Sequence, residues 1–291
     1  MAPTSWTREN VRHAVSLFRY DRHPAATVYD SLGSEFFLAL APGWLNLGLW
    51  EGDGSDPDEA PVAVRRLVER LARELPIGGD VLDVGNGLAE QDPLIAEVSE
   101  AASLTALNIT LSQLQAGAAR LAESGTRPVN ADATRMPLRD GSFDGVISVE
   151  AAFHFPSRAR FFSEAFRLLR PGGVLSMSDI PTRRLPRGPR EMVAALTQLR
   201  VWGLGVNAAA TEDEIVALAL DAGFVDVRTE LVGRRTIAPA LRFARDRLDR
   251  THGEVPRTYD LAVRFLLSQV DVIWQHGMID YLLLRATKPE G

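Results

Sequence analysis

The chain has 291 residues, of which 46% are hydrophobic and 24% charged, and its formal net charge is −6. This length and composition exclude a disordered protein and predict one α/β domain that is enlarged by inserted helices. The acidic balance argues against a nucleic-acid partner, and the absence of cysteine excludes disulfides, thiol catalysis and cysteine-ligated metals.

The N-terminal residues 1–59 are expected to form a helical cap. Apolar spacing predicts two helices within residues 7–40 that are separated near Pro24, and Pro42 and Gly43 end the second one. Charged residues within residues 1–20 argue against a signal peptide, and no run of about 18 apolar residues predicts a membrane span. We therefore expect a cytoplasmic protein, and the sequence leaves a homo-oligomer open. The apolar, aromatic residues 44–50, followed by a polar loop, have the character of a lid.

Residues 60–291 are expected to form one domain in which strands and helices alternate. The expected strands cover residues 80–84, 103–107, 128–130, 145–149, 173–178, 223–228 and 279–286. The expected helices cover residues 60–75, 92–101, 112–124, 159–169, 238–250 and 257–275, with a further helix that begins at Thr211 in a capping box. Such alternation predicts a parallel sheet with right-handed crossovers. Residues 181–210 interrupt it, carry a helix of their own and are a candidate substrate cap.

A glycine-containing turn follows the first expected strand. Gly85 and Gly87 allow positive φ and a close backbone approach, so a nucleotide-like cofactor is expected at the carboxyl end of that strand. A tight turn without any ligand also uses such glycines. Asp83, two residues before Gly85, would repel a pyrophosphate but could pair with the ammonium group of an amino acid. This favours S-adenosylmethionine over a dinucleotide.

Several segments in the right order resemble the class I S-adenosylmethionine-dependent methyltransferases, in particular their bacterial small-molecule branch with sugar, polyketide and lipid O-methyltransferases. The segments are Asp83–Gly87, Asn108–Gln113, Asn130–Ala133, Phe143–Val146, Val149–Ala151 and Leu169–Gly173. The resemblance implies a Rossmann-like, doubly wound sheet of about seven strands whose last strand is antiparallel. It also implies an enzyme that uses S-adenosylmethionine and releases S-adenosylhomocysteine.

The resemblance assigns most of the cofactor site. It implies that Gly85 and Gly87 line the methionine part, that Asp132 bonds the adenine amino group beside Ala133, and that Glu150 lies just past the fourth strand in the same pocket. Asp132 could instead cap a turn.

Two positions depart from the family pattern. Ala89 stands where the loop has its third glycine, and Asn108 stands where many relatives have an acid after the second strand. Alanine is small enough to keep the turn. Asn108, Thr110 or Gln113 could still bond ribose hydroxyls, more weakly than a carboxylate would.

The candidate catalytic residues follow the fourth and fifth strands. His154 is the predicted general base for a hydroxyl acceptor, and Asp179 is predicted to orient or balance it, or to act on the acceptor itself. The alternatives are a core histidine stacked on Phe153 and Phe155, and an aspartate that caps a helix or turn. The scattered histidines show no metal-ligand spacing, so we expect no metal.

These observations predict O-methylation of a small, lipophilic natural product or lipid intermediate by in-line methyl transfer. One alternative keeps the fold and the cofactor but methylates carbon or couples methylation to ring closure. The other is a non-catalytic binding protein with a decayed cofactor loop.

Overall fold

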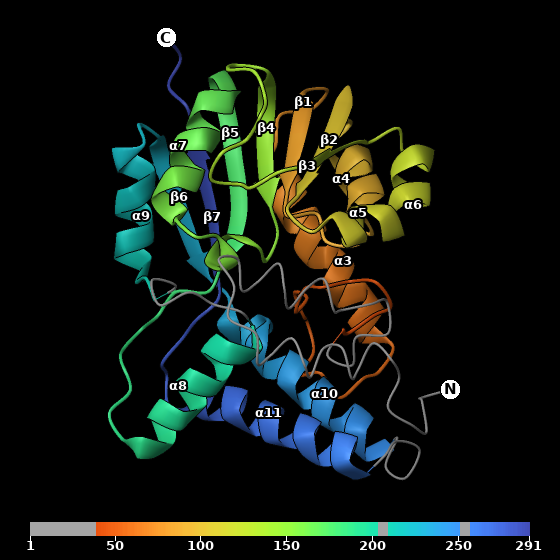
Figure 1. The fold of residues 1–291 in the computed structure, drawn as a ribbon, viewed down its shortest axis with the longest axis vertical. Helices are drawn as coiled ribbons and strands as arrows, with labels where there is room; N and C mark the ends of the chain where they lie inside the picture. Colours follow the sequence, from red (N-terminus) through yellow and green to blue (C-terminus); the bar gives the residue numbers. More distant parts are fainter. Residues whose placement is uncertain (1–38, 203–208, 251–256) are drawn as a thin grey trace.

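The computed structural model describes residues 39–202, 209–250 and 257–291. The two helices expected within residues 7–40 lie outside them except for Ala39 and Leu40, which are not helical. A seven-stranded sheet in the order β3-β2-β1-β4-β5-β7-β6 forms the centre of the molecule (Figure 1). Its strands are β1 (Asp80–Val84), β2 (Ser103–Asn108), β3 (Arg127–Asn130), β4 (Phe143–Ser148), β5 (Leu169–Asp179), β6 (Val225–Leu231) and β7 (Leu282–Thr287). Strands β1 to β5 are parallel, and β7 runs antiparallel to both β5 and β6. The predicted Rossmann-like sheet with an antiparallel last strand is confirmed.

Helices cover both faces of the sheet because successive side chains of the buried strands point to opposite sides. Leu82 packs in a core with α7 (Arg158–Leu168) and α9 (Glu212–Asp221), whereas Val81 packs in a second core with α3 (Glu59–Ala72) and α4 (Asp92–Ser99). The short helices α5 (Leu111–Ala116) and α6 (Ala118–Glu123) flank β2 and β3.

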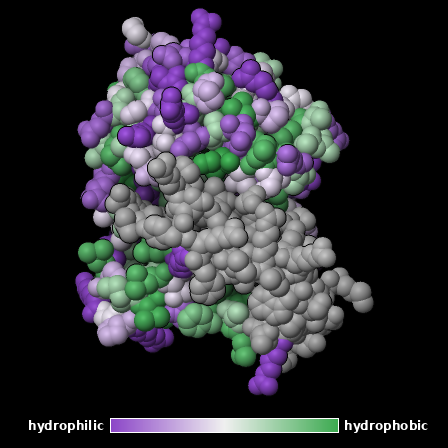
Figure 2. Space-filling model, in the orientation of Figure 1, coloured by the Kyte–Doolittle hydropathy of each residue, from purple (hydrophilic) through white to green (hydrophobic). Residues whose placement is uncertain are grey.

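A further group of helices lies below the sheet, at the end where β5 leaves it (Figure 1). It consists of α8 (Pro189–Val201) from the predicted cap insertion, α10 (Ile237–Arg250) and α11 (Arg257–Gln275). Helix α8 packs against α11 and leaves the side chains of Met192, Val193 and Leu196 about half exposed. Figure 2 shows apolar residues gathered at this lower left part of the molecule. None of the described helices combines the length and the apolar character that crossing a membrane requires.

Most element boundaries lie within three residues of the sequence-based predictions, and three of the differences have identifiable reasons. The predicted helix 112–124 divides at Gly117, where an added Cβ would lie 2.7 Å from the Cβ of Ala89. Strand β5 begins at Leu169 and not at residue 173 as expected, so Pro171 and Gly172 lie inside the strand, where the pairing register with β4 shifts. Strand β7 begins at Leu282, after Ile279 makes an isolated bridge to Thr182. The capping box of Thr211 and Glu214 at the start of α9 is present as predicted.

Candidate active site

The glycine loop after β1 forms the first wall of the site. Gly85 and Gly87 have φ values of 86° and 58°, and the amide of Gly85 donates a hydrogen bond to the carbonyl oxygen of Leu107 at 2.7 Å. A Cβ on Gly85 would lie 2.4 Å from the Cβ of Ala151, so no larger residue fits there. Ala89 has φ of 65° and thus takes the left-handed backbone conformation in spite of its methyl group, at a cost of about 1–2 kcal/mol.

Buried polar atoms lie beneath this loop. Asp83 is fully buried, and its Oδ2 accepts a hydrogen bond from Nε2 of Gln91 at 2.7 Å. Asn86 donates to Asp92 at 3.0 Å. Oδ1 of Asp83 and Oδ1 of Asn86 have no hydrogen-bond partner within the part of the chain that the structure describes. Burial raises the pKa of the Asp83 carboxyl well above its usual range, and the neighbouring Asp92 raises it further. A cationic donor bound here would stabilise the ionised carboxylate.

The three predicted ribose ligands at the end of β2, Asn108, Thr110 and Gln113, make different contacts. Asn108 supports the loop, because its amide donates to the carbonyl oxygen of Gly87 at 3.2 Å and to Oε1 of Gln113 at 3.0 Å. Its Oδ1 accepts a hydrogen bond from the amide of Thr110, the N-cap residue of α5. Nε2 of Gln113, a buried side chain, has no partner among the described residues. Gln113 is therefore the amide that is available to a ligand hydroxyl.

The predicted adenine ligand Asp132 also caps a turn. Its Oδ1 accepts hydrogen bonds from the amide and from the hydroxyl of Thr134, both at 2.8 Å. Ala133 beside it is buried. Oδ1 of Asp132 thus caps a turn, as the alternative interpretation expects. A bond from Asp132 to the adenine amino group stays a prediction.

Glu150 follows β4 in a left-handed conformation, with φ of 50°. Its amide donates to Oγ of Ser178 at 2.9 Å, and its Oε1 accepts from the hydroxyl of Tyr281 at 2.8 Å and from the amide of Leu47 at 2.5 Å. Leu47 belongs to residues 44–50, which we call the strap. Burial raises the pKa of Glu150 to about 7 against these hydrogen bonds. Sequence reasoning missed Ser178 and Tyr281, because a serine and a tyrosine in apolar strands carry no distinguishing pattern.

The strap lies against both the glycine loop and Glu150. Leu45 approaches Gly87, where an added Cβ would lie 3.3 Å from its Cδ1, and Leu47 bonds Glu150. Trp50 is fully buried, and its backbone amide donates to the carbonyl oxygen of Arg235 at 2.7 Å. The predicted lid segment is thus packed over the carboxyl ends of β1 and β4.

The predicted catalytic residues lie near the same edge but do not hydrogen-bond each other in the described contacts. Asp179 is fully buried and forms a two-pronged ion pair with Arg158, with N–O distances of 2.8 and 2.9 Å. His154 stacks on Phe153, with ring centroids 4.2 Å apart. Burial lowers the pKa of His154 to about 3, opposed by a hydrogen bond with the backbone of Trp202 and assisted by the charge of Arg158. His154 is therefore neutral at pH 7. Sequence reasoning missed Arg158, because an arginine at a helix start resembles a solvent-exposed one.

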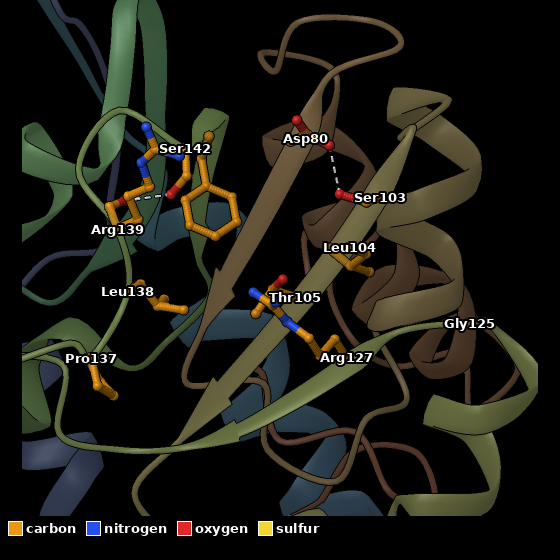
Figure 3. Close-up of a pocket in the computed structure, with 11 residues that line it drawn as sticks. Asp80, Ser103, Leu104, Thr105, Gly125, Arg127, Pro137, Leu138, Arg139 and Ser142 are labelled. Carbon is orange, nitrogen blue, oxygen red and sulfur yellow. Dashed lines mark hydrogen bonds between the residues drawn. The ribbon is translucent and has the colours of Figure 1, made fainter.

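A separate pocket of about 500 Å³ opens at the opposite edge of the sheet, near the amino ends of β1 and β2 (Figure 3). Its lining includes Asp80, Ser103, Arg127 and Arg139 and contains none of the predicted site residues. The described residues contain no group of three or more His, Asp or Glu side chains that could hold a metal ion.

The residues at the carboxyl edge fit the predicted cofactor on structural grounds. Asp83 and Asn86 present unpaired acceptor oxygens, as an ammonium group requires, and Gln113 presents an unpaired donor. The left-handed glycines beside them are partly buried, and parallel sheets bind ligands at this edge.

Comparison with known proteins decides the family. Residues 82–177 match a family described as a methyltransferase domain. The chain is 30% identical over 253 residues to the 27-O-demethylrifamycin SV methyltransferase of Amycolatopsis mediterranei, covering 84% of this chain and 90% of that protein. The chain belongs to the class I S-adenosylmethionine-dependent methyltransferases. It is an enzyme, and its cofactor is S-adenosylmethionine.

A second curated relative agrees with the natural-product branch, and a solved structure supports the fold. The methyltransferase is 27% identical over 278 residues to the erythromycin 3''-O-methyltransferase of Saccharopolyspora erythraea, covering 91% of this chain and 90% of that one. The crystal structure of the 4+2 cyclase SpnF superimposes with a TM-score of 0.67 at 21% identity and covers 99% of this chain and 98% of its own. The methyltransferase thus has a fold that a cyclase also uses.

Proposed function

We propose that this methyltransferase transfers the methyl group to a hydroxyl oxygen of a lipophilic natural-product intermediate. The observation that carries the proposal is the similarity, over about nine-tenths of their lengths, to two natural-product methyltransferases, of which the erythromycin enzyme is named as an O-methyltransferase. The acidic chain and the exposed apolar side chains of α8 below the sheet agree with an uncharged or weakly polar acceptor.

The cofactor site of this proposal consists of the loop and strand ends already described. Asp83 would hold the ammonium group, with the backbone of Gly85 and Gly87 alongside the methionine part. Gln113 would bond a ribose hydroxyl, and Asp132 and Ala133 would face the adenine. The cofactor supplies an activated methyl group whose bond to sulfur breaks, with its electron pair returning to sulfur, as the bond to the acceptor oxygen forms.

The protein then has two tasks, alignment and proton removal. Alignment of this kind supplies about 7–11 kcal/mol, and a general base adds about 10²–10⁴-fold. The base predicted from the sequence is His154, with Asp179 orienting or balancing it or acting on the acceptor itself. The structure adds Arg158, whose charge acts on both groups. A histidine whose pKa is about 3 is a weak proton acceptor, so Glu150 at the same edge is a competing candidate.

The first test is calorimetric titration of the purified protein with S-adenosylmethionine and S-adenosylhomocysteine. The wild-type protein is expected to bind both at micromolar concentration, and Gly85→Val is expected to lose binding because its side chain would overlap Ala151. Gly141→Val is the matched control, because Gly141 also has positive φ but has open space around it. Binding that Gly85→Val retains, or none by the wild type, would reject the assigned site.

The second test identifies the acceptor. Hydroxylated macrocycles, with 27-O-demethylrifamycin SV as the first probe, are incubated with the protein and S-adenosylmethionine, and products are analysed by mass and by nuclear magnetic resonance. A new methoxy group supports the proposal. A methyl group on carbon, or a ring closed without methylation, would reject the proposal in favour of the C-methyltransferase or cyclase alternative. The cyclase is included because SpnF has a similar fold.

A further inference from the structure

We propose that Glu150 is the group that removes the proton from the acceptor hydroxyl, through its Oε2 atom, and that Tyr281 and Ser178 position it. This inference rests on the proposed O-methylation. It replaces the role of cofactor ligand that the resemblance implies for Glu150.

The first argument is position. Glu150 stands at the carboxyl end of β4, and the next residue, Ala151, occupies the space against which Gly85 packs. The strap joins the two, since Leu45 approaches Gly87 and Leu47 bonds Oε1 of Glu150. The carboxylate therefore contacts the strap, one residue before the Ala151 that packs against the glycine loop, at the edge where the activated methyl group is expected.

The second argument is how the carboxylate is held. Three hydrogen bonds fix the residue, and the two on the side chain both fall on Oε1. Oε2 receives no hydrogen bond from the described residues, so it is the oxygen that is available to a proton. The left-handed backbone at this non-glycine residue costs about 1–2 kcal/mol, which is typical of functional sites whose surroundings fix the geometry.

The third argument is electrostatic. Burial raises the pKa of Glu150 to about 7, which is close to the value that suits a general base at neutral pH. The ionisable side chain that bonds it is Tyr281, directly before β7, whose own pKa burial raises well above 10, so that it stays a neutral donor. Asp179 on β5 is neutralised by Arg158, and residues 44–50 contribute no ionisable side chain. The strap side of the carboxylate thus offers no competing proton acceptor.

The proton balance of the step is complete. The O–H bond of the acceptor breaks and its proton moves to Oε2, while the oxygen electron pair forms the new bond to the methyl carbon. The negative charge of the carboxylate and the positive charge of the sulfonium are consumed together. The protonated Glu150 later returns its proton to water.

The test compares the binding of S-adenosylmethionine and S-adenosylhomocysteine between pH 5.5 and 8.5. An ionised carboxylate beside the transferred methyl group favours the charged cofactor, so the preference for S-adenosylmethionine should rise about three- to tenfold with pH in the wild type. Glu150→Gln should abolish that rise and keep the affinity for S-adenosylhomocysteine. Tyr281→Phe removes a hydrogen-bond donor to the carboxylate. It should therefore move the midpoint of the pH-dependent preference to higher pH.

Control variants separate this role from the alternatives. Glu164→Gln is the matched control, because Glu164 is bound to Arg167 on α7 and is absent from the site. His154→Gln should retain the pH-dependent preference. Equal weakening of both ligands by Glu150→Gln would make Glu150 a cofactor ligand and overturn the inference, and so would a pH-independent preference in the wild type. Failure of the wild type to bind either ligand would instead reject the proposed function.

Once an acceptor is known, kinetics provide a second readout. Glu150→Gln is expected to lower kcat by about 10²–10⁴-fold with KM for the cofactor little changed, and to remove the acidic limb of the pH profile. Loss of that limb in His154→Gln but not in Glu150→Gln would assign the proton to His154 and overturn the inference.

Discussion

The two edges of the parallel sheet satisfy their polar groups in opposite ways. At the amino edge, Asp80 accepts hydrogen bonds from Ser103 and Arg170, and Asp144 accepts from the amide of Asp80 and from Arg170. These side chains are about one-third exposed and mutually paired.

At the carboxyl edge, polar groups are buried and left open. Asp83, Asn86 and Gln113 each keep an atom without a partner among the described residues, and Ala89 and Glu150 have left-handed backbones. Unpaired buried groups cost about 1–3 kcal/mol each, so this edge retains them at the expense of stability. The difference shows which edge is shaped for a ligand, although the amino edge has the 500 Å³ pocket.

The largest expected effect tests the ion-paired carboxylate of Asp179 at the carboxyl edge. Arg158→Met would leave the fully buried Asp179 without its counter-charge and should lower the free energy of unfolding by about 3–5 kcal/mol. Urea denaturation monitored by circular dichroism measures this change.

The control for that variant is the same substitution at the amino edge. Arg170→Met removes an equally well-bonded arginine, but its partners are solvated, so the cost should be about 1 kcal/mol or less. Equal losses in the two variants would mean that burial does not distinguish the two edges.

The sheet was predictable from the sequence because each buried strand is an apolar run that ends at a turn or a charged residue. Strand β1 has the predicted bounds, because it begins at the charged Asp80 and stops at Val84, directly before Gly85. The glycine loop and Asp83 were predictable for the same local reason. The start of β5 was not, because Pro171 and Gly172 suggest a turn while pairing with β4 continues past them.

The polar network of the site could not be predicted, because its members come from distant parts of the chain. Glu150 meets Leu47 from 103 residues away and Tyr281 from 131 residues away. The pairing of Asp179 with Arg158 likewise depends on how α7 packs beside β5. Only tertiary structure decides such contacts, so the sequence identified the residues of the edge but not their partners.

The second prediction concerns pH and the open edge. Burial raises the pKa of Asp83, of Asp92 to about 6 and of Glu150 to about 7, so these three groups bind more protons in the native state than in the unfolded state at mildly acidic pH. These three carboxyls should therefore destabilise the unliganded protein as pH rises from about 4 to 7, by about 3 kcal/mol for each two units by which a pKa is raised. Asp83→Asn should reduce this slope, stabilise the unliganded protein at pH 7 by about 1 kcal/mol and weaken S-adenosylhomocysteine at least about tenfold.

Asp80→Asn is the opposite-sign control for this prediction. Hydrogen bonds from Ser103 and Arg170 lower the pKa of Asp80, so its contribution to stability is present above the unfolded pKa and is lost as pH falls. The variant should therefore be less stable than the wild type at pH 7, with unchanged cofactor affinity. Calorimetric melts across pH measure the stability change in both variants. An Asp83→Asn protein that binds S-adenosylhomocysteine as tightly as the wild type would contradict the assignment of Asp83 as a cofactor ligand.

The smallest expected effect tests whether the backbone strain at Ala89 affects cofactor affinity or only the stability of the loop. Ala89→Gly relieves a left-handed backbone that costs about 1–2 kcal/mol, but it loses a buried methyl worth about 0.8 kcal/mol and adds about 0.5–1 kcal/mol of unfolded-state entropy. These contributions nearly cancel, so the free energy of unfolding should change by about 0.5 kcal/mol or less. Affinity for S-adenosylhomocysteine should change less than about twofold, because the backbone path already matches that of a glycine. A tenfold gain in affinity would instead show that the methyl group of Ala89 restricts the cofactor pocket and lowers the affinity for the cofactor.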